Sequence, residues 1–390
     1  MSSIVLSASV RQNLLSLQST ADLLSTTQSR LATGKKVNTA LDNPTNFFTA
    51  QSLDNRASDI NNLLDGIGNG VQVLQAANTG ITSLQKLVDS AKSVAQQVLQ
   101  APVGYSAKSS TTSTAAITGT ADDLVDGVSF AAGTTLSVTP AGGGTAVVFT
   151  FTATTSLADL NAGLVSAGVQ ASLDSSNKLV ITNTNNDTAS STLAAVTLGG
   201  IAGTTPATFV APTAPTVDVG SQATRANLVA QYNTIIDNIT KTAQDSSYNG
   251  INLLNGDNLK LTFNETGSSK LNITGSISDA TGLGLKTLVS GTDFKDSSSA
   301  NIVITALGKA NSSLRTLASS LGSNLSVVQI RQDFSKSLIN VLQTGASNLT
   351  LADTNEEAAN SQALSTRQSI AVSALALANQ SQQSVLQLLR

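Results

Sequence analysis

Two long stretches of this 390-residue chain place apolar residues at alternating intervals of three and four, and no proline interrupts them. In residues 45–100 the repeat comprises Leu53, Ala57, Ile60, Leu64, Ile67, Val71, Leu74, Asn78 and Ile81. A 3.5-residue repeat of this length is typical of a coiled coil. As one helix, residues 45–100 span about 85 Å, far more than the width of a globular domain. The chain is therefore expected to build long helices.

Both ends of the chain carry the same spacing. Near the N-terminus the repeat comprises Val10, Leu14, Leu17, Ala21, Leu24, Gln28 and Leu31. In the C-terminal part it comprises Leu307, Ala310, Leu314, Leu317, Leu321, Asn324 and Val328, and then Leu364, Gln368, Ala371, Leu375, Ala378, Gln382, Val385 and Leu389. Residues 354–357, Thr-Asn-Glu-Glu, predict a capping box that opens the last helix.

The last helix has a second apolar stripe beside the first, made of Ile370, Ala374, Leu377 and Leu388. A lone antiparallel helix pair leaves such a stripe in water, and exposed apolar faces mark partner surfaces. Packing inside an ordinary intramolecular bundle is the other interpretation, and the pattern alone leaves both open.

The middle of the chain differs in composition. Residues 101–219 contain 23 Thr but no Arg and no Glu, and four of the six prolines lie between 140 and 215. Alternating segments at 133–139, 146–152 and 178–182 predict strands, and residues 157–167 predict a short helix. The predicted fold class is mainly α, with a long antiparallel coiled coil or helical bundle formed by both termini and a small inserted β or α+β domain.

The composition excludes much of enzyme chemistry. The chain has no His and no Cys, so it lacks the usual general base, thiolate nucleophiles and sulfur or imidazole metal ligands. Two groups of acidic residues are expected to lie in solvated loops rather than to bind a cation. They are Asp122, Asp123 and Asp126, and Asp293 with Asp296. The glycine run 141–145 is expected to be a hairpin turn, because it lacks the Lys-Ser/Thr end of a phosphate loop. Surface Ser and Thr of residues 105–219 are either acceptors of O-linked sugars or simply strand formers.

Partners and targeting are also constrained. The formal net charge of −3 does not suit nucleic-acid binding, and no run of 18 apolar residues is present to cross a membrane. No basic region precedes an apolar core at the N-terminus, so no secretory signal peptide of the usual kind is expected. We therefore expect no enzyme activity, no cofactor, no metal, no nucleic-acid partner and no membrane span.

Three motifs resemble bacterial flagellin, the subunit of the flagellar filament. Residues 31–42, Leu-Ala-Thr-Gly-Lys-Lys-Val-Asn-Thr-Ala-Leu-Asp, are similar to the family's Leu-Ser-Ser-Gly-Leu-Arg-Ile-Asn-Ser-Ala-Lys-Asp turn. Residues 248–254, Tyr-Asn-Gly-Ile-Asn-Leu-Leu, resemble its Phe-Asn-Gly-x-x-Leu-Leu. Residues 378–380 and 383–390 match its C-terminal signature. The resemblance covers roughly residues 1–100 and 220–390, and the insert falls earlier in the chain than in the more familiar members.

The resemblance implies a domain organisation and a role. Residues 1–43 and 351–390 are expected to form an inner terminal coiled coil that is disordered in the monomer. Residues 44–103 and 220–350 are expected to form a helical shell with a β-hairpin near 259–275, and residues 104–219 a variable outer domain. The implied function is a structural subunit that polymerises into the extracellular filament for motility after unfolded export through the flagellar type III channel. The implied partners are further copies of the chain, the filament cap, hook-associated junction proteins, and the export apparatus with its chaperone.

The resemblance also implies two sets of site residues. The polymerisation interface is expected at Val10, Leu14, Leu17, Leu24, Leu31, Leu364, Ala371, Leu375, Ala378, Val385, Leu386 and Leu389. Many family members carry Gln-Arg-Val-Arg-Glu-Leu-Ala on the helix after the first long bend, and a Toll-like receptor binds it. The corresponding positions here are Asp89, Ser90, Lys92, Ser93 and Val94, with Gln231 on the facing helix.

Two alternatives to a filament subunit stay open. A hook–filament junction protein has the same terminal helices, and an adhesin carried on the filament would use the outer domain. The C-terminal match and the Asn249-Gly250 motif favour the bulk subunit over the junction protein. The few aromatic residues at 104–219 include the strand Phe residues, which are expected to fill a core rather than a binding surface, and this disfavours the adhesin.

Overall fold

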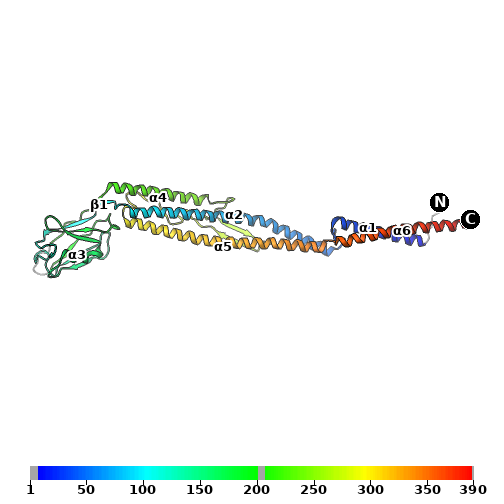
Figure 1. Ribbon diagram of the computed structural model, residues 1–390, viewed down its shortest axis with the longest axis horizontal. Helices are drawn as coiled ribbons and strands as arrows, with labels where there is room; N and C mark the ends of the chain where they lie inside the picture. Colours follow the sequence, from blue (N-terminus) through cyan, green and yellow to red (C-terminus); the bar gives the residue numbers. More distant parts are fainter. Residues whose placement is uncertain (1–7, 201–206, 389–390) are drawn as a thin grey trace. The chain divides into compact units, whose positions relative to one another are not determined.

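The computed structural model describes residues 8–200 and 207–388 (Figure 1). The helices are α1 (Ala8–Thr33), α2 (Pro44–Gln100), α3 (Leu157–Leu164), α4 (Val219–Asp245), α5 (Ser297–Thr350) and α6 (Thr354–Leu388). The strands are β1 (Tyr105–Ala107), β2 (Ser110–Ala116), β3 (Thr135–Val138), β4 (Val147–Thr150), β5 (Val169–Leu173), β6 (Lys178–Asn183), β7 (Thr197–Gly199), β8 (Thr216–Val217), β9 (Asn258–Thr262) and β10 (Lys270–Thr274). The predicted fold class, long terminal helices around a small strand-containing insert, is confirmed.

The chain forms two compact units. The first comprises Met1–Val71, Lys260–Leu271 and Ser326–Arg390, and the second comprises Gln72–Leu259 and Asn272–Leu325. The boundaries between the units fall inside α2 and α5 rather than at the predicted limits 43/44 and 350/351. The three-part division into inner coiled coil, shell and outer domain therefore stays a prediction.

In the first unit, α1 and α6 lie side by side in antiparallel order (Figure 1). The end of α1 meets the start of α6, where Arg30 Nη1 lies 3.3 Å from Glu357 Oε1. The turn after α1 is tied to the turn before α6, because the amide of Lys36 donates to the carbonyl of Thr350 at 2.7 Å and that of Ala352 to Gly34 at 3.0 Å. The motif at 31–42 thus closes the helix pair at one end.

The predicted capping box at 354–357 is wrong in its first residue. The side chain of Asp353 accepts from the amides of Asn355 (2.9 Å) and Glu356 (3.3 Å), so Asp353 is the cap. An Asp side chain accepts hydrogen bonds at this position as effectively as a Thr side chain. It also adds a negative charge, which the helix N-terminus favours. Glu357 pairs with Arg30 of α1 instead of folding back on its own helix.

The first unit also packs the beginning of α2 against the end of α5. A small apolar cluster joins Ala57 and Ile60 of α2 to Ile339 and Leu342 of α5. The predicted hairpin is present as β9–β10 and its tip lies in this unit. Glu265 in the tip lies 2.7 Å from Arg56 of α2, and Arg331 of α5 covers the ring of Phe263 at 5.7 Å.

In the second unit, α2, α4 and α5 run side by side, and the predicted seams are largely confirmed (Figure 1). On α5 the residues Leu307, Ala310, Leu314, Leu321 and Val328 are buried. On α2 the prediction is wrong at Asn78, which is exposed. Ala77 and Gly80 are buried instead, because such small residues let another segment of the same chain come close to α2.

Gly80 provides a test of this close approach. A Cβ atom built there lies 2.7 Å from Leu254 Cδ1 and closer still to Ser246 Oγ. The Ser246 hydroxyl donates a hydrogen bond to the carbonyl of Thr242 at 2.6 Å, so this side chain cannot move away freely. We expect Gly80→Ala to lower the free energy of unfolding by about 1–3 kcal/mol through overpacking.

The matched control on the same helix is Gly66→Ala. A Cβ at Gly66 meets nothing within 4 Å. Because Ala has the higher helix propensity, this change is expected to raise stability by about 0.5–1 kcal/mol. Denaturant unfolding followed by circular dichroism measures both, and two changes of the same sign would contradict the packing at Gly80.

The insert between α2 and α4 is an α+β domain. It holds two three-stranded sheets with strand orders β2-β6-β5 and β4-β3-β7, both antiparallel, and β1 pairs with β8 at its base. The predicted helix 157–167 is α3 followed by a 3₁₀ turn at Val165–Ala167. Phe130 and Phe151 are fully buried with ring centroids 5.6 Å apart. The prediction that these aromatics fill a core is confirmed, and the glycine run 141–145 lies in the β3–β4 hairpin as expected.

Candidate self-association surfaces

On α6 the half-buried side chains are those of the predicted seam, together with Ser361. The seam residues are Leu364, Gln368, Ala371, Leu375 and Ala378. The predicted interface positions Val385 and Leu386 lie on α6 in a part whose side chains the structure does not describe, and Leu389 lies outside the described residues. The spacing thus identified the face of α6 that α1 covers.

On α1 the predicted seam is partly wrong. Gln28 is exposed, and Leu14 and Leu31 are 37% and 41% exposed. The more protected side chains are Val10, Asn13, Leu17, Thr20, Ala21, Leu24, Thr27 and Arg30. The helix turns a more polar face to α6 than the apolar repeat predicts. This face is tolerated because the Thr20 hydroxyl donates to the Ser16 carbonyl at 2.8 Å within its own helix.

The α1–α6 pair therefore leaves apolar side chains uncovered on both helices. Those on α1 are Leu14, Leu15, Leu23 and Leu31, and those on α6 are Ile370, Val372 and Leu377. Of the predicted second stripe, Ile370, Ala374 and Leu377 are exposed, as expected for a lone pair, and the Leu388 side chain is not described. Apolar surface of this extent on a helix pair is typical of a partner surface.

A further uncovered surface lies on α5 and was missed at the sequence level. Val327, Ile330, Phe334 and Val341 fall on one helix face and are 42–65% exposed. We call these four residues the α5 stripe. Their spacing of three, four and seven is the signal that could have revealed it, since it runs beside the seam at Val328.

The positions that correspond to the family's receptor motif lie on α2 and α4. Ser90, Ser93 and Gln231 are exposed, Lys92 is half-buried and Val94 is buried. Asp89 accepts a hydrogen bond at 2.8 Å from Asn311 of α5. Contacts of α2 with residues at both ends of α4, at Gly80 with Ser246 and at Val98 with Arg225, show that the helices are antiparallel. This pairing places Ser93 level with Gln231.

The acidic groups act locally on the backbone. Asp126 Oδ1 accepts from the amides of residues 128–130 at 2.8–2.9 Å. Asp123 Oδ1 accepts from Val125 N, Asp293 Oδ2 from Val289 N, and Asp296 Oδ1 from Ser299 N. Within the described residues, no three His, Cys, Asp or Glu side chains lie together as a metal site would require.

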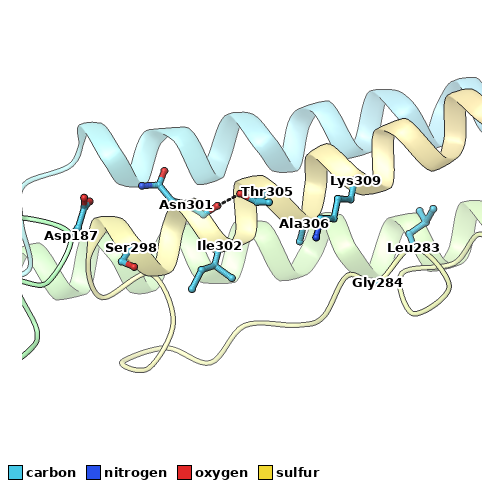
Figure 2. A pocket seen from close by; sticks show the side chains of 9 residues that line it. All are labelled: Asp187, Leu283, Gly284, Ser298, Asn301, Ile302, Thr305, Ala306 and Lys309. Atoms are coloured by element: carbon cyan, nitrogen blue, oxygen red, sulfur yellow. Dashed lines mark hydrogen bonds between the residues drawn. The ribbon is translucent and has the colours of Figure 1, made fainter. Parts of the chain in front are cut away.

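A surface groove of about 570 Å³ runs along the start of α5 (Figure 2). Asp187 of the insert and Leu283 with Gly284 of the preceding loop border it. The Thr305 hydroxyl is tied to the Asn301 carbonyl at 2.8 Å, and Ile302 is exposed. The groove has one carboxylate, Asp187, and one amine, Lys309, which come from different elements and form no ion pair with each other in the described part of the chain. The groove thus offers no constellation for acid–base or nucleophilic catalysis.

Among the described helices, none combines the length and the hydropathy needed to span a bilayer.

The long helices at both ends of the chain match known families. Residues 4–135 match the bacterial flagellin N-terminal helical region, and residues 304–389 match the bacterial flagellin C-terminal helical region. Together the matches cover more than half of the chain, in the order in which the helices occur. The chain belongs to the bacterial flagellins. This family is one of structural proteins.

Several flagellins are similar to this chain over part of its length. Flagellin FljM of Caulobacter vibrioides is 32% identical over 165 residues, which is 42% of this chain and 59% of the relative. A flagellin of Brucella melitensis is 28% identical over 177 residues, 43% of this chain and 62% of the relative. Flagellin A of Rhizobium meliloti is 36% identical over 88 residues, 23% of this chain and 22% of the relative. This flagellin thus spans about three fifths of the length of the first two relatives.

Proposed function

We propose that this flagellin is a structural subunit that polymerises, copy against copy, into an extracellular flagellar filament used for motility. The observation that carries the proposal is the uncovered apolar surface on α1, α6 and α5, which a single chain leaves in water. Apolar burial at about 25 cal/mol per Å² supplies a driving force for association once neighbours cover these helices. Membership of the flagellin family supports the same role.

The interface set that we propose combines the predicted residues with the α5 stripe. Leu14 and Leu31 face away from α6 and are available to a neighbour, whereas Leu364, Ala371, Leu375 and Ala378 hold the α1–α6 pair together. Val10, Leu17 and Leu24 belong to the same pair. Val385, Leu386 and Leu389 remain predicted interface positions.

The export route and the other partners are inferred from membership of the flagellin family. We infer that the chain is exported unfolded through the flagellar type III channel with a chaperone, and that it meets the filament cap and the hook-associated junction proteins. No cofactor, catalytic residue, nucleic acid or membrane enters this role. Phe130 and Phe151 fill the core of the insert, so these two rings are not available to an aromatic binding surface of the kind an adhesin uses.

The hook–filament junction role is distinguished by copy number. Sheared filaments analysed by quantitative mass spectrometry are expected to contain this chain in thousands of copies per filament. A handful of copies per filament, confined to one end, would assign it to the junction instead.

Assembly should order the terminal helices. An α1–α6 pair that leaves so many Leu side chains in water gains little to offset about 1–2 kcal/mol of backbone entropy per residue. We expect limited proteolysis to remove about 40 residues from each end of the monomer but not of the filament. Mass spectrometry of the digests measures this, and a monomer with protease-resistant ends would contradict it.

The insert is expected to be dispensable for polymerisation. Joining residue 103 to residue 220 removes β1 and β8 together and leaves the helices that carry the apolar surfaces. Electron microscopy should show filaments that still form and are thinner. A shortened chain with full helix content that fails to polymerise would show that the insert makes essential lateral contacts.

A further inference from the structure

Two charged side chains are buried where the insert joins the helices. Arg225 of α4 is 2% exposed, and Asp296, just before α5, is 5% exposed. Arg and Asp are almost never fully buried unless they are paired or hydrogen-bonded, because removing their charge from water is costly. Both residues belong to the second compact unit, as does the whole insert.

Arg225 connects three segments through their backbone. Its Nη1 donates to the carbonyl of Phe294 at 2.7 Å, its Nε to Pro102 at 3.1 Å and its Nη2 to Val98 at 3.3 Å. These carbonyls lie in the loop before α5, in the linker that enters the insert, and in the last turns of α2. A planar guanidinium with donors in fixed directions suits this arrangement, whereas the point charge of Lys does not.

Asp296 makes the second connection. Its Oδ2 accepts the hydroxyl of Ser190, in the insert, at 2.5 Å, and its Oδ1 accepts the amide of Ser299 in the first turn of α5 at 2.9 Å. One carboxylate therefore caps α5 and holds a loop of the insert. Close by, burial and then the negative charge of Asp296 raise the pKa of the Tyr105 phenol on β1.

A third contact lies at the entrance of the insert itself. The side chain of Gln222, one turn before Arg225, donates to the carbonyl of Gly104 at 3.0 Å. A Cβ at Gly104 would overlap this side chain, so the linker passes α4 closely. Polar side chains of α4 thus satisfy the carbonyls of the linker at the boundary of the insert.

We propose that Arg225 and Asp296 are positioning residues that hold the insert in one orientation on α2, α4 and α5. Domains joined by short linkers move relative to one another by default unless specific contacts prevent it. Asp296 bonds to the insert and to α5, and Arg225 bonds to the linker that enters the insert, to α2 and to the loop before α5. A hinge motion at the junction therefore leaves a buried charge without partners, which is strongly unfavourable. The insert is thereby presented at a fixed angle rather than on a flexible tether.

The test measures one distance across the junction in the full-length chain. The chain has no Cys, so Val165→Cys in the insert and Ala230→Cys on α4 place two spin labels at exposed positions and nowhere else. Labelled chain is diluted into unlabelled chain, so that only distances within a molecule are recorded by double electron–electron resonance. The parent chain should give one narrow distance distribution.

Three variants loosen the junction to different degrees. Arg225→Met removes the donors and keeps much of the side-chain volume, Asp296→Asn removes the charge, and Ser190→Ala removes one hydroxyl. Each is expected to lose the single narrow peak, with a distribution about twice as wide for Arg225→Met. The matched control is Lys241→Met on the same helix, whose exposed pair with Asp237 touches no other element, and it should keep the narrow peak.

Circular dichroism separates positioning from unfolding, because helix content should be unchanged while the distance distribution widens. If Arg225→Met does not fold, Ser190→Ala, which removes only one hydroxyl from a half-buried side chain of the insert, gives the answer. A broad distribution in the parent chain overturns the proposal. A narrow peak retained in both Ser190→Ala and Asp296→Asn overturns it equally.

Discussion

Leu375→Asp is expected to abolish filament assembly. Leu375 lies half-buried at the centre of the α6 seam, where α1 covers it, and neighbouring copies would seal this pair further. A carboxylate enclosed there loses its water, at a cost of about 3 kcal/mol or more. We expect the critical concentration for polymerisation to rise at least about a hundredfold.

The control for this change is Ser365→Asp, which adds the same charge to an exposed position of the same helix. It should polymerise at nearly the parent concentration, as measured by light scattering and by the protein left after sedimentation. Equal loss of assembly in both variants would mean that added negative charge, rather than burial at the seam, is responsible. Normal assembly of Leu375→Asp would remove the seam from the proposed interface.

Restoring the family's receptor motif is expected to raise activation of a Toll-like receptor by the monomer. This chain carries Ser90, Ser93 and Gln231 where family members have Arg, Glu and Glu, and all three side chains are exposed. Ser93 of α2 lies level with Gln231 of α4, so the three changes fall on one region of the helix pair. Ser cannot supply the planar donor fork of Arg.

The chain with Ser90→Arg, Ser93→Glu and Gln231→Glu should activate at a concentration at least about tenfold lower than the parent, since an interface hot spot is worth about 2 kcal/mol. A receptor-reporter cell assay with monomer measures this. The control adds the same residue types to exposed positions of α1, as Ser19→Arg, Ser25→Glu and Gln18→Glu, and should not change activation. Strong activation by the parent would contradict the prediction.

The sequence predicts helical faces well where the helix is long and its partner is fixed. On α5 the residues Leu307, Ala310 and Leu314 are buried as their spacing indicates, and on α6 Leu364 and Leu375 face α1. Periodicity is a local property of the chain and survives in any packing that covers the stripe. The hairpin and the helix that follows Ser156 were likewise predictable, because turn and cap chemistry is local.

Local patterns fail where two packing solutions compete. The apolar repeat of α1 places Leu14 and Leu31 in the seam, yet α1 turns Thr20 and Thr27 toward α6 and leaves both leucines exposed. On α2 the repeat names Asn78, whereas the closer approach allowed by Gly80 brings Ala77 into the core. Which face a helix buries depends on the shape of its neighbour, and the neighbour is remote in sequence.

Composition and periodicity are enough to predict the long terminal helices and the inserted strand-rich domain, and to exclude His and Cys chemistry, because they act through short-range geometry. The positioning role of Arg225 and Asp296 emerges only from the packed chain, since the sequence presents them as one ordinary helix charge and one loop acid. Their partners are backbone carbonyls and a serine hydroxyl more than 60 residues away. A buried charge must keep its hydrogen-bond partners, because losing them is costly. Which charges are buried depends on the folded chain.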